Sequence, residues 1–311
     1  MTRRVALLFA FLFIVSCGST AAPAPASFAS ASARPSATAA AFPASITDFQ
    51  NRSVAISTRP ERIVSIGPSN TEFLFALGAG DRVVGDDDYS DEPAAAKTKE
   101  HVGGVKVNIE KVVSLKPDLI ITVKFSDGTI EALTQTGAPV LVIDPQGAAD
   151  VARSATLIGR AIGADGTKLA KDIQAKLDAV KAKTDAAPKV TVFHEVDASD
   201  PAKIYTVGPG SFIDDLIKIA GGTNVFASAK TAYPTVSGEE IIRADPDVIV
   251  LGDALYGTTI ESVAARPGWA ALNAVKNKHV YAGLSLFSRP GPRLGEAAQE
   301  YAKLVHPELF K

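Results

Sequence analysis

The chain has 311 residues, of which 46% are hydrophobic and 21% are charged, and it contains 24 glycines and 19 prolines. This composition excludes a disordered or fibrous chain, and the length suggests about two domains. A net charge of −2 provides no positive field for a polyanion, so we expect no nucleic-acid partner. The single cysteine, Cys17, excludes an internal disulfide and a cysteine-based metal site.

Residues 1–16 have the layout of a secretory signal. Arg3 and Arg4 precede an uncharged apolar run over residues 5–15, which is shorter than the roughly 20 residues of a membrane-spanning helix. The run ends in IVSC, which resembles a bacterial lipobox. We therefore expect residues 1–16 to be a lipoprotein signal peptide and Cys17 to carry a lipid anchor on the extracytoplasmic, periplasmic face of a membrane. A chance thiol in an ordinary secretory signal is the alternative.

A tether is expected after the signal. Residues 17–45 are rich in alanine, serine and proline and carry one charged side chain, Arg34. Such a segment cannot bury enough apolar surface to fold. We predict that it links the anchor to a folded body that begins near Ile46.

Two blocks of the body repeat each other. EKVVSLKPDLII at 110–121 matches EEIIRADPDVIV at 239–250. Each block is typical of a short helix, a Pro-Asp turn and a buried strand of a parallel sheet. The pattern predicts an α/β protein with two Rossmann-like lobes, over residues 46–149 and 189–311.

A second pair of blocks supports this duplication. SIGPS at 65–69 and TVGPGS at 206–211 each open a segment that ends at glycines. This pattern predicts a helix after each block, with Ser69 and Ser211 as the N-caps.

Residues 150–188 have no counterpart in either half. Their latter part is amphipathic, with apolar residues at a helical spacing at Leu169, Ile173, Leu177 and Val180. It predicts a single long helix of about 30 Å that joins the lobes. A ligand cleft is expected between the lobes, lined by loops at the carboxyl ends of the strands.

The sequence contains no G-x-S-x-G elbow, H-E-x-x-H motif, P-loop or Cys–His pair. Ser211 comes nearest to a nucleophile, but a helix N-cap is its simpler role. We therefore expect neither enzymatic activity nor an intrinsic cofactor. An exported α/β hydrolase or metalloenzyme is the alternative.

Seven further segments form a pattern in chain order. They are TDFQNR at 47–52, PERIVS at 60–65, SNTE at 69–72, YSD at 89–91, GG at 103–104, LKPDLI at 115–120 and SRPGPR at 288–293. With these segments the body resembles the periplasmic substrate-binding proteins of ABC transporters that take up cobalamin, ferric siderophores and haem, the helical-backbone metal receptors. The resemblance implies the two-lobe fold with a backbone helix. It also implies a monomer that binds a cobalt or iron chelate (cobalamin or another corrinoid, a ferric siderophore or haem) and delivers it to an ABC permease dimer. A tethered haem or metal chaperone without a transporter is a further alternative.

The resemblance assigns permease docking to one glutamate in each lobe. Glu110 and Glu239 match these positions and begin the repeated blocks. Equivalent carboxylates at two helix N-termini also suit a permease dimer with two basic sites. The alternative is that each carboxylate only stabilises its helix dipole.

The resemblance also implies contacts with the ligand. The matching side chains are Tyr89, Phe125, Tyr233, Phe287 and Arg289, and the alternative for Phe125 is packing on its own lobe. The chain differs from the cobalamin-binding member at Ser285, where that protein has an aspartate. The aspartates at 86–88, just before Tyr89, are interpreted as a solvated loop, because calcium ligands usually alternate with spacers.

One histidine, His194, is a further candidate ligand residue. His194 ends a predicted strand and could face the cleft as an axial ligand of haem iron or cobalt, with Tyr205 as a second donor. A structural role is the commoner alternative for a lone histidine. No other direct metal ligand is expected.

Overall fold

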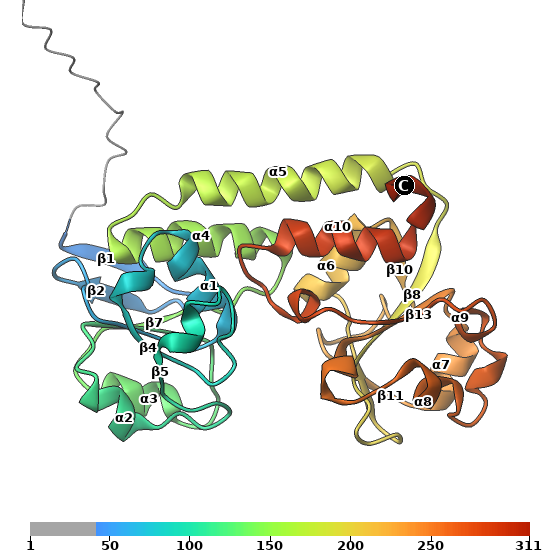
Figure 1. Cartoon of the computed structure of the whole chain (residues 1–311), viewed down its shortest axis with the longest axis horizontal. Helices are drawn as coiled ribbons and strands as arrows, with labels where there is room; N and C mark the ends of the chain where they lie inside the picture. The colour runs from blue at the N-terminus through green and yellow to red at the C-terminus, as the bar shows by residue number, and fades with distance from the viewer. Residues whose placement is uncertain (1–41) are drawn as a thin grey trace, which may run out of the picture. The chain divides into compact units, whose positions relative to one another are not determined.

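The computed structural model describes residues 42–311 (Figure 1). The predicted signal peptide, Cys17 and most of the predicted tether lie outside the described residues. Strand β1 (Ala44–Thr47) pairs antiparallel with β2 (Ser53–Ile56), so regular structure begins slightly before Ile46. Within residues 42–311, no helix combines the length and apolar character needed to cross a bilayer.

The N-terminal lobe contains a parallel sheet of five strands in the order β5-β4-β3-β6-β7. The strands are β3 (Ile63–Ser65), β4 (Val83–Asp86), β5 (Glu100–His101), β6 (Leu119–Thr122) and β7 (Val140–Val142). The helices between them are α1 (Pro68–Ala76), α2 (Ile109–Ser114) and α3 (Thr129–Thr134). All four residues of β6 are buried, which explains the continuous apolar run of the first repeated block.

The C-terminal lobe contains a mixed sheet in the order β11-β9-β8-β12-β13, and β10 also pairs with β8. The strands are β8 (Val190–Asp197), β9 (Ile204–Thr206), β10 (Gly222–Asn224), β11 (Thr235–Val236), β12 (Val248–Leu251) and β13 (Val280–Ala282). The helices of this lobe are α6 (Phe212–Ile219), α7 (Gly238–Ala244), α8 (Ile260–Ala264) and α9 (Asn273–Lys276). Strands β8, β10, β12 and β13 are parallel as predicted, whereas β9 and β11 run antiparallel to their neighbours.

The Pro-Asp turns have the same role in both lobes. Asp118 accepts hydrogen bonds from the backbone N–H groups of Glu61 and Arg62, each at 2.8 Å, just before β3. Asp247 accepts hydrogen bonds from the backbone N–H (2.9 Å) and the Oγ1 (2.6 Å) of Thr191 in β8. In each lobe the aspartate thus fixes the start of the neighbouring central strand, which supports an internal duplication.

The second pair of blocks is equivalent only in part. In the N-terminal lobe the block follows β3, whereas in the C-terminal lobe it follows β9, the antiparallel partner of β8. The Oγ of Ser211 caps α6 by accepting from the backbone N–H of Asp214, at 3.1 Å. Ser69 does not cap α1, because that helix begins at Pro68, behind Gly67 with φ 105°. Proline suits this first position, since it has no N–H to satisfy.

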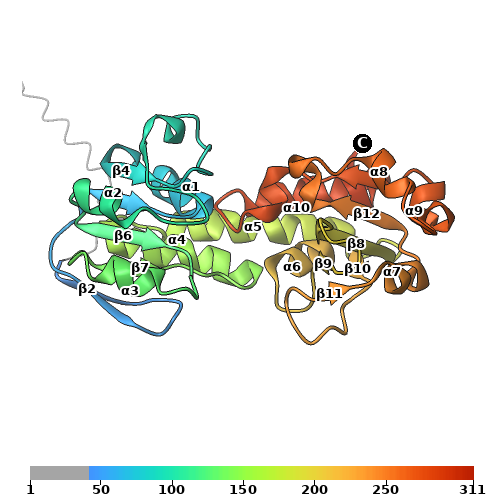
Figure 2. The same cartoon turned by 90° about the horizontal axis from the view of Figure 1, so that it is seen from below.

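The predicted backbone helix is α5 (Thr167–Thr184), whose buried side chains include Ile173, Leu177 and Val180. It packs against two other long helices, α4 (Ala148–Ile162) and α10 (Leu294–Val305). Figures 1 and 2 show α4 beside the N-terminal half of α5 and α10 beside its C-terminal half. The apolar stripe from which we predicted α5 did not indicate α4.

Charged contacts also connect the lobes. Glu72 of α1, whose side chain is 4% exposed, forms salt bridges with Arg289 (3.4 Å) and Arg293 (2.8 Å), which precede α10. Asp215 of α6 accepts a hydrogen bond at 2.9 Å from the backbone N–H of Ala148, at the start of α4. We call Glu72, Arg289 and Arg293 the arginine joint.

Candidate functional site

A cavity of about 370 Å³ lies between the two lobes, and we call it the cleft. From the N-terminal lobe, Gly67, Val123 and Ile143 line it, just after β3, β6 and β7. From the C-terminal lobe, Tyr256 and Ser285 line it, after β12 and β13. The cleft thus lies at the carboxyl ends of the strands of both sheets, where open α/β folds bind ligands.

Two of the predicted ligand residues, Tyr89 and Arg289, line the cleft. The Tyr89 side chain is 49% exposed. Arg289 donates hydrogen bonds to Asp91 (2.5 Å) and to the backbone oxygen of Tyr89 (3.4 Å). The guanidinium group therefore joins the two walls of the cleft, and a ligand that approaches it must share it with these acceptors.

Asp87 organises the N-terminal wall. Its Oδ2 accepts hydrogen bonds from the backbone N–H of Gly67 (2.6 Å) and from the Oγ of Ser90 (3.0 Å). Its Oδ1 accepts from the backbone N–H of Tyr89 at 2.8 Å. The carboxylate thereby fixes the turn after β3 relative to the loop that carries Tyr89.

The aspartate run is therefore only in part the solvated loop that we predicted, because Asp88 is exposed but the two aspartates before it are buried. Asp86 and Asp87 are 0% and 2% exposed, because β4 extends to Asp86 inside the sheet. Burial raises the pKa of Asp86 to about 7, although His101, 3.1 Å away, has a lowering effect. Within residues 42–311, no cluster of three or more histidine, cysteine or acidic side chains could hold a metal ion.

Tyr205 and Tyr233 are exposed on the C-terminal lobe, at 48% and 44%. Partial burial and the negative charge of Asp144 raise the pKa of Tyr233 to about 12. Because Asp144 follows β7 of the other lobe, Tyr233 lies near the junction of the lobes. Tyr205 lies in β9 opposite Thr235. Neither tyrosine lines the cleft, so their contact with a ligand stays a prediction.

The structure contradicts the predicted roles of His194 and Phe287, which are both 1% exposed. The Nδ1 of His194 lies 3.1 Å from the hydroxyl of Tyr301 in α10, and the two rings stack. Burial lowers the pKa of His194 to about 3, so the ring is neutral. The Phe287 ring packs against the same tyrosine, with 5.0 Å between the centroids. Both side chains face α10 in the core and not the cleft.

Phe125 does not line the cleft either. It follows β6 and packs half-buried against a core cluster of its own lobe that contains Val64 and Ile120. Its near neighbour Val123 lines the cleft instead. The alternative that we considered for Phe125, packing on its own lobe, describes this position.

Two residues of the cleft wall were missed. Leu255 and Tyr256 line the cleft and are 57% and 85% exposed. They lie in the short 3₁₀ turn Gly252–Tyr256 after β12. Two large apolar side chains in a loop between Gly252 and Gly257 were the signal that could have identified them.

The two predicted docking glutamates occupy equivalent positions. Glu110 is the second residue of α2 and Glu239 the second residue of α7, and both are exposed. In α7 the neighbouring Glu240 forms the capping box with Ser237, so Glu239 is not needed for it. Figure 1 shows α2 and α7, one in each lobe, on the side of the body away from α5. Docking itself stays a prediction.

Comparisons with known proteins agree with this geometry. The chain is 37% identical over 281 residues to the uncharacterized ABC transporter substrate-binding lipoprotein YvrC of Bacillus subtilis. The alignment covers 87% of this chain and 88% of that protein. It is 30% identical over 293 residues to a cobalamin-binding protein of Halobacterium salinarum, with 86% and 75% covered. The periplasmic vitamin B12 binding protein BtuF of Vibrio cholerae has a similar structure, with a TM-score of 0.68 and 27% identity, over 81% of this chain and 99% of that one.

A family model matches most of the two lobes. It is the model of the periplasmic binding proteins, and it matches residues 63–285. This range includes the sheets of both lobes and α5. The chain therefore belongs to the periplasmic binding protein family.

Proposed function

We propose that this protein is an exported, lipid-anchored receptor that binds a metal chelate in the cleft and delivers it to an ABC permease. The observation that carries the proposal is the cleft itself, formed by both lobes at the carboxyl ends of their strands. Residues from both lobes would enclose a small molecule there, as in a receptor that holds its cargo until handover. In this proposal the protein has no catalytic role and no cofactor of its own.

The chemistry of the lining favours a chelate. Tyr89 and Tyr256 present aromatic rings from opposite lobes, and Arg289 and Ser285 add polar groups. Aromatic faces bury flat, partly apolar molecules, and a guanidinium binds carboxylate or amide oxygens. These groups hold a chelate by its outer surface, so the metal is bound by the chelator. Among cobalamin or another corrinoid, a ferric siderophore and haem, the names of the relatives favour a corrinoid.

Location and delivery follow from two further features. Cys17 provides the lipid anchor, in agreement with the lipoprotein named among the relatives. Glu110 and Glu239 present one exposed carboxylate from each lobe. Two equivalent carboxylates suit the two basic sites of a permease dimer, with which the receptor docks as a monomer.

Charge reversal tests the delivery step. We expect the Glu110→Lys/Glu239→Lys variant to bind cargo as the wild type does, while uptake by cells that depend on this receptor is lost. The matched control is Glu131→Lys/Glu261→Lys, which reverses two exposed first-turn glutamates of α3 and α8. This control should retain both binding and uptake. Normal uptake with the docking variant would overturn the permease assignment and favour a tethered chaperone.

A further inference from the structure

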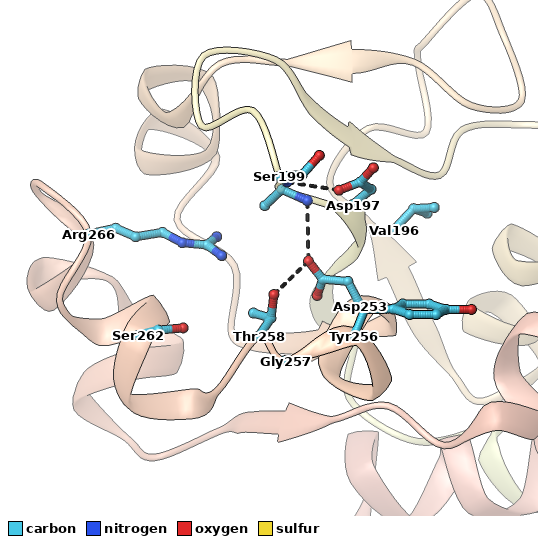
Figure 3. A pocket seen from close by; sticks show the side chains of 10 residues that line it. Val196, Asp197, Ser199, Asp253, Tyr256, Gly257, Thr258, Ser262 and Arg266 are labelled. Carbon is cyan, nitrogen blue, oxygen red and sulfur yellow. Dashed lines mark hydrogen bonds between the residues drawn. The ribbon is translucent and has the colours of Figure 1, made fainter.

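A second cavity, of about 610 Å³, lies in the C-terminal lobe, and we call it the acidic pocket (Figure 3). Its walls come from the loop after β8, the 252–258 loop after β12, and α8. The polar side chains that line it are those of Asp197, Ser199, Asp253, Thr258, Ser262 and Arg266. The pocket is thus built at the carboxyl ends of two central strands, as the cleft is.

The floor of this pocket contains a buried carboxylate with incomplete hydrogen bonding. Asp253 is 5% exposed. Its Oδ2 accepts hydrogen bonds from the backbone N–H of Ala198 (3.2 Å) and the Oγ1 of Thr258 (2.9 Å). Its Oδ1 is buried without a hydrogen-bond donor among the described residues. Leaving a buried acceptor unsatisfied is unfavourable, so a donor that reached this group would be stabilised there.

The charges around Asp253 do not balance. Arg266 donates to both carboxylate oxygens of Glu195, at 2.5 and 2.8 Å, so its charge is already neutralised. Burial raises the pKa of Glu195, Arg266 lowers it, and the nearby Asp253 charge raises it further. Asp253 itself forms no salt bridge with a described residue, so its carboxylate has no cation of its own beside it. Such a site favours N–H groups and positive charge and disfavours a further carboxylate.

The acidic pocket adjoins the cleft through one residue. Tyr256 lines both cavities. Figure 3 shows its ring on the opposite side of the Asp253 carboxylate from Arg266. A chelate that contacts Tyr256 in the cleft therefore has the acidic pocket within reach of its peripheral arms.

We propose that the acidic pocket receives an N–H-bearing arm of the cargo, such as a carboxamide, and disfavours an arm that ends in a carboxylate, with Asp253 setting this preference. The inference rests on the proposed function, because it assigns a specificity to the same receptor. It selects amide-rich chelates, such as corrinoids with carboxamide side chains, over chelates with carboxylate arms.

Binding of two matched corrinoids tests the inference. The probes are dicyanocobyric acid, whose arms are mostly carboxamides, and dicyanocobyrinic acid, whose arms are carboxylates. For the wild type we expect the amide-rich probe to bind at least about tenfold more tightly, the size of effect typical of hydrogen bonds to a charged group. In Asp253→Asn this preference should fall about tenfold. Asparagine has the same shape as aspartate, so we expect a folded variant, which thermal unfolding checks.

Two further variants separate the buried carboxylate from general surface charge. Asp197→Asn removes an exposed acid of the same pocket and should leave the preference within about twofold, since its charge is screened by water. Ser199→Lys adds a positive charge at the exposed rim without altering Asp253, and for the same reason it should also leave the preference within about twofold.

Three results would overturn the inference. They are an unchanged preference in Asp253→Asn, an effect of Asp197→Asn or Ser199→Lys as large as that of Asp253→Asn, and equal wild-type affinity for the two probes. If the wild type bound neither probe, nor cyanocobalamin, the corrinoid assignment under the proposed function would fail, and this inference with it.

Discussion

The two lobes share a repeated block but differ in what surrounds it. In both lobes a helix with a glutamate at its second position leads through a Pro-Asp turn into a buried central strand, β6 or β12. The N-terminal sheet is parallel throughout, whereas β8 of the C-terminal lobe pairs with the antiparallel β9. The shared part holds the strands and carries the two glutamates that we propose dock to the permease. The part that differs builds the acidic pocket, so specificity is expected to reside mainly in the C-terminal lobe.

The arginine joint is asymmetric, because the N-terminal lobe supplies the acid and the C-terminal lobe supplies both arginines. Glu72→Gln would leave Arg289 and Arg293, whose side chains are 14% and 33% exposed, without their shared buried carboxylate. We expect a loss of about 2–3 kcal/mol in the free energy of unfolding, measured by urea denaturation. Glu300→Gln, which removes an exposed pair with Lys303, should cost no more than about 0.5 kcal/mol. Equal effects would show that the joint adds little to stability.

The Pro-Asp turns allow a direct comparison of equivalent residues. Asp247→Ala removes two hydrogen bonds to the partly buried Thr191 and should cost about 2 kcal/mol. Asp118→Ala removes two bonds in an exposed setting and should cost about 1 kcal/mol. Urea denaturation of both variants measures the difference. A larger effect of Asp118→Ala would contradict the view that burial controls the strength of these contacts.

The strands β4 and β10 end in different residues, the buried Asp86 and the buried Asn224. Burial raises the pKa of Asp86 to about 7, so the folded state binds its proton more tightly than the unfolded state does. Its contribution to stability is therefore full below the ordinary aspartate pKa of about 4 and is lost progressively as the pH rises to about 7. We expect Asp86→Asn to reduce the loss of stability between pH 5 and pH 8 by about 1–2 kcal/mol, measured by denaturation at both pH values. An unchanged pH dependence would show that Asp86 does not titrate in this range.

The smallest expected difference concerns the starts of α1 and α6. Ser211→Ala removes the N-cap of α6 and should cost about 1 kcal/mol. Ser69→Ala should cost no more than a few tenths of that, because α1 begins at Pro68 without a side-chain cap. Thermal unfolding of the two variants checks this order, and equal effects would restore a capping role for Ser69.

The local sequence pattern predicted the strands, turns and helices whose burial depends on residues nearby in the chain. The apolar run of β6, the Pro-Asp turn and the amphipathic stripe of α5 each reflect burial that repeats with the period of a strand or helix. Ser69 was misplaced because glycine, proline and serine compete for the same helix start.

Burial against distant elements could not be predicted in this way. His194 follows the strand pattern, but α10, more than 100 residues later in the chain, covers it with Tyr301. Phe287 turns toward the same tyrosine. In contrast, Tyr256 is exposed because its turn after β12 projects into the cleft. Tertiary packing determines which side of a strand end is covered. The residue pattern of a single segment therefore cannot predict that side.

We propose that the cleft between the lobes binds a metal chelate. The most direct test is an absorbance titration of the purified wild type, and of Tyr256→Ala, with cyanocobalamin, haemin and a ferric hydroxamate. We expect saturable binding of one chelate at one molecule per chain, with cyanocobalamin as the first candidate, and weaker binding by Tyr256→Ala. Binding of none of the three to the wild-type protein would show that the cleft is not a chelate site.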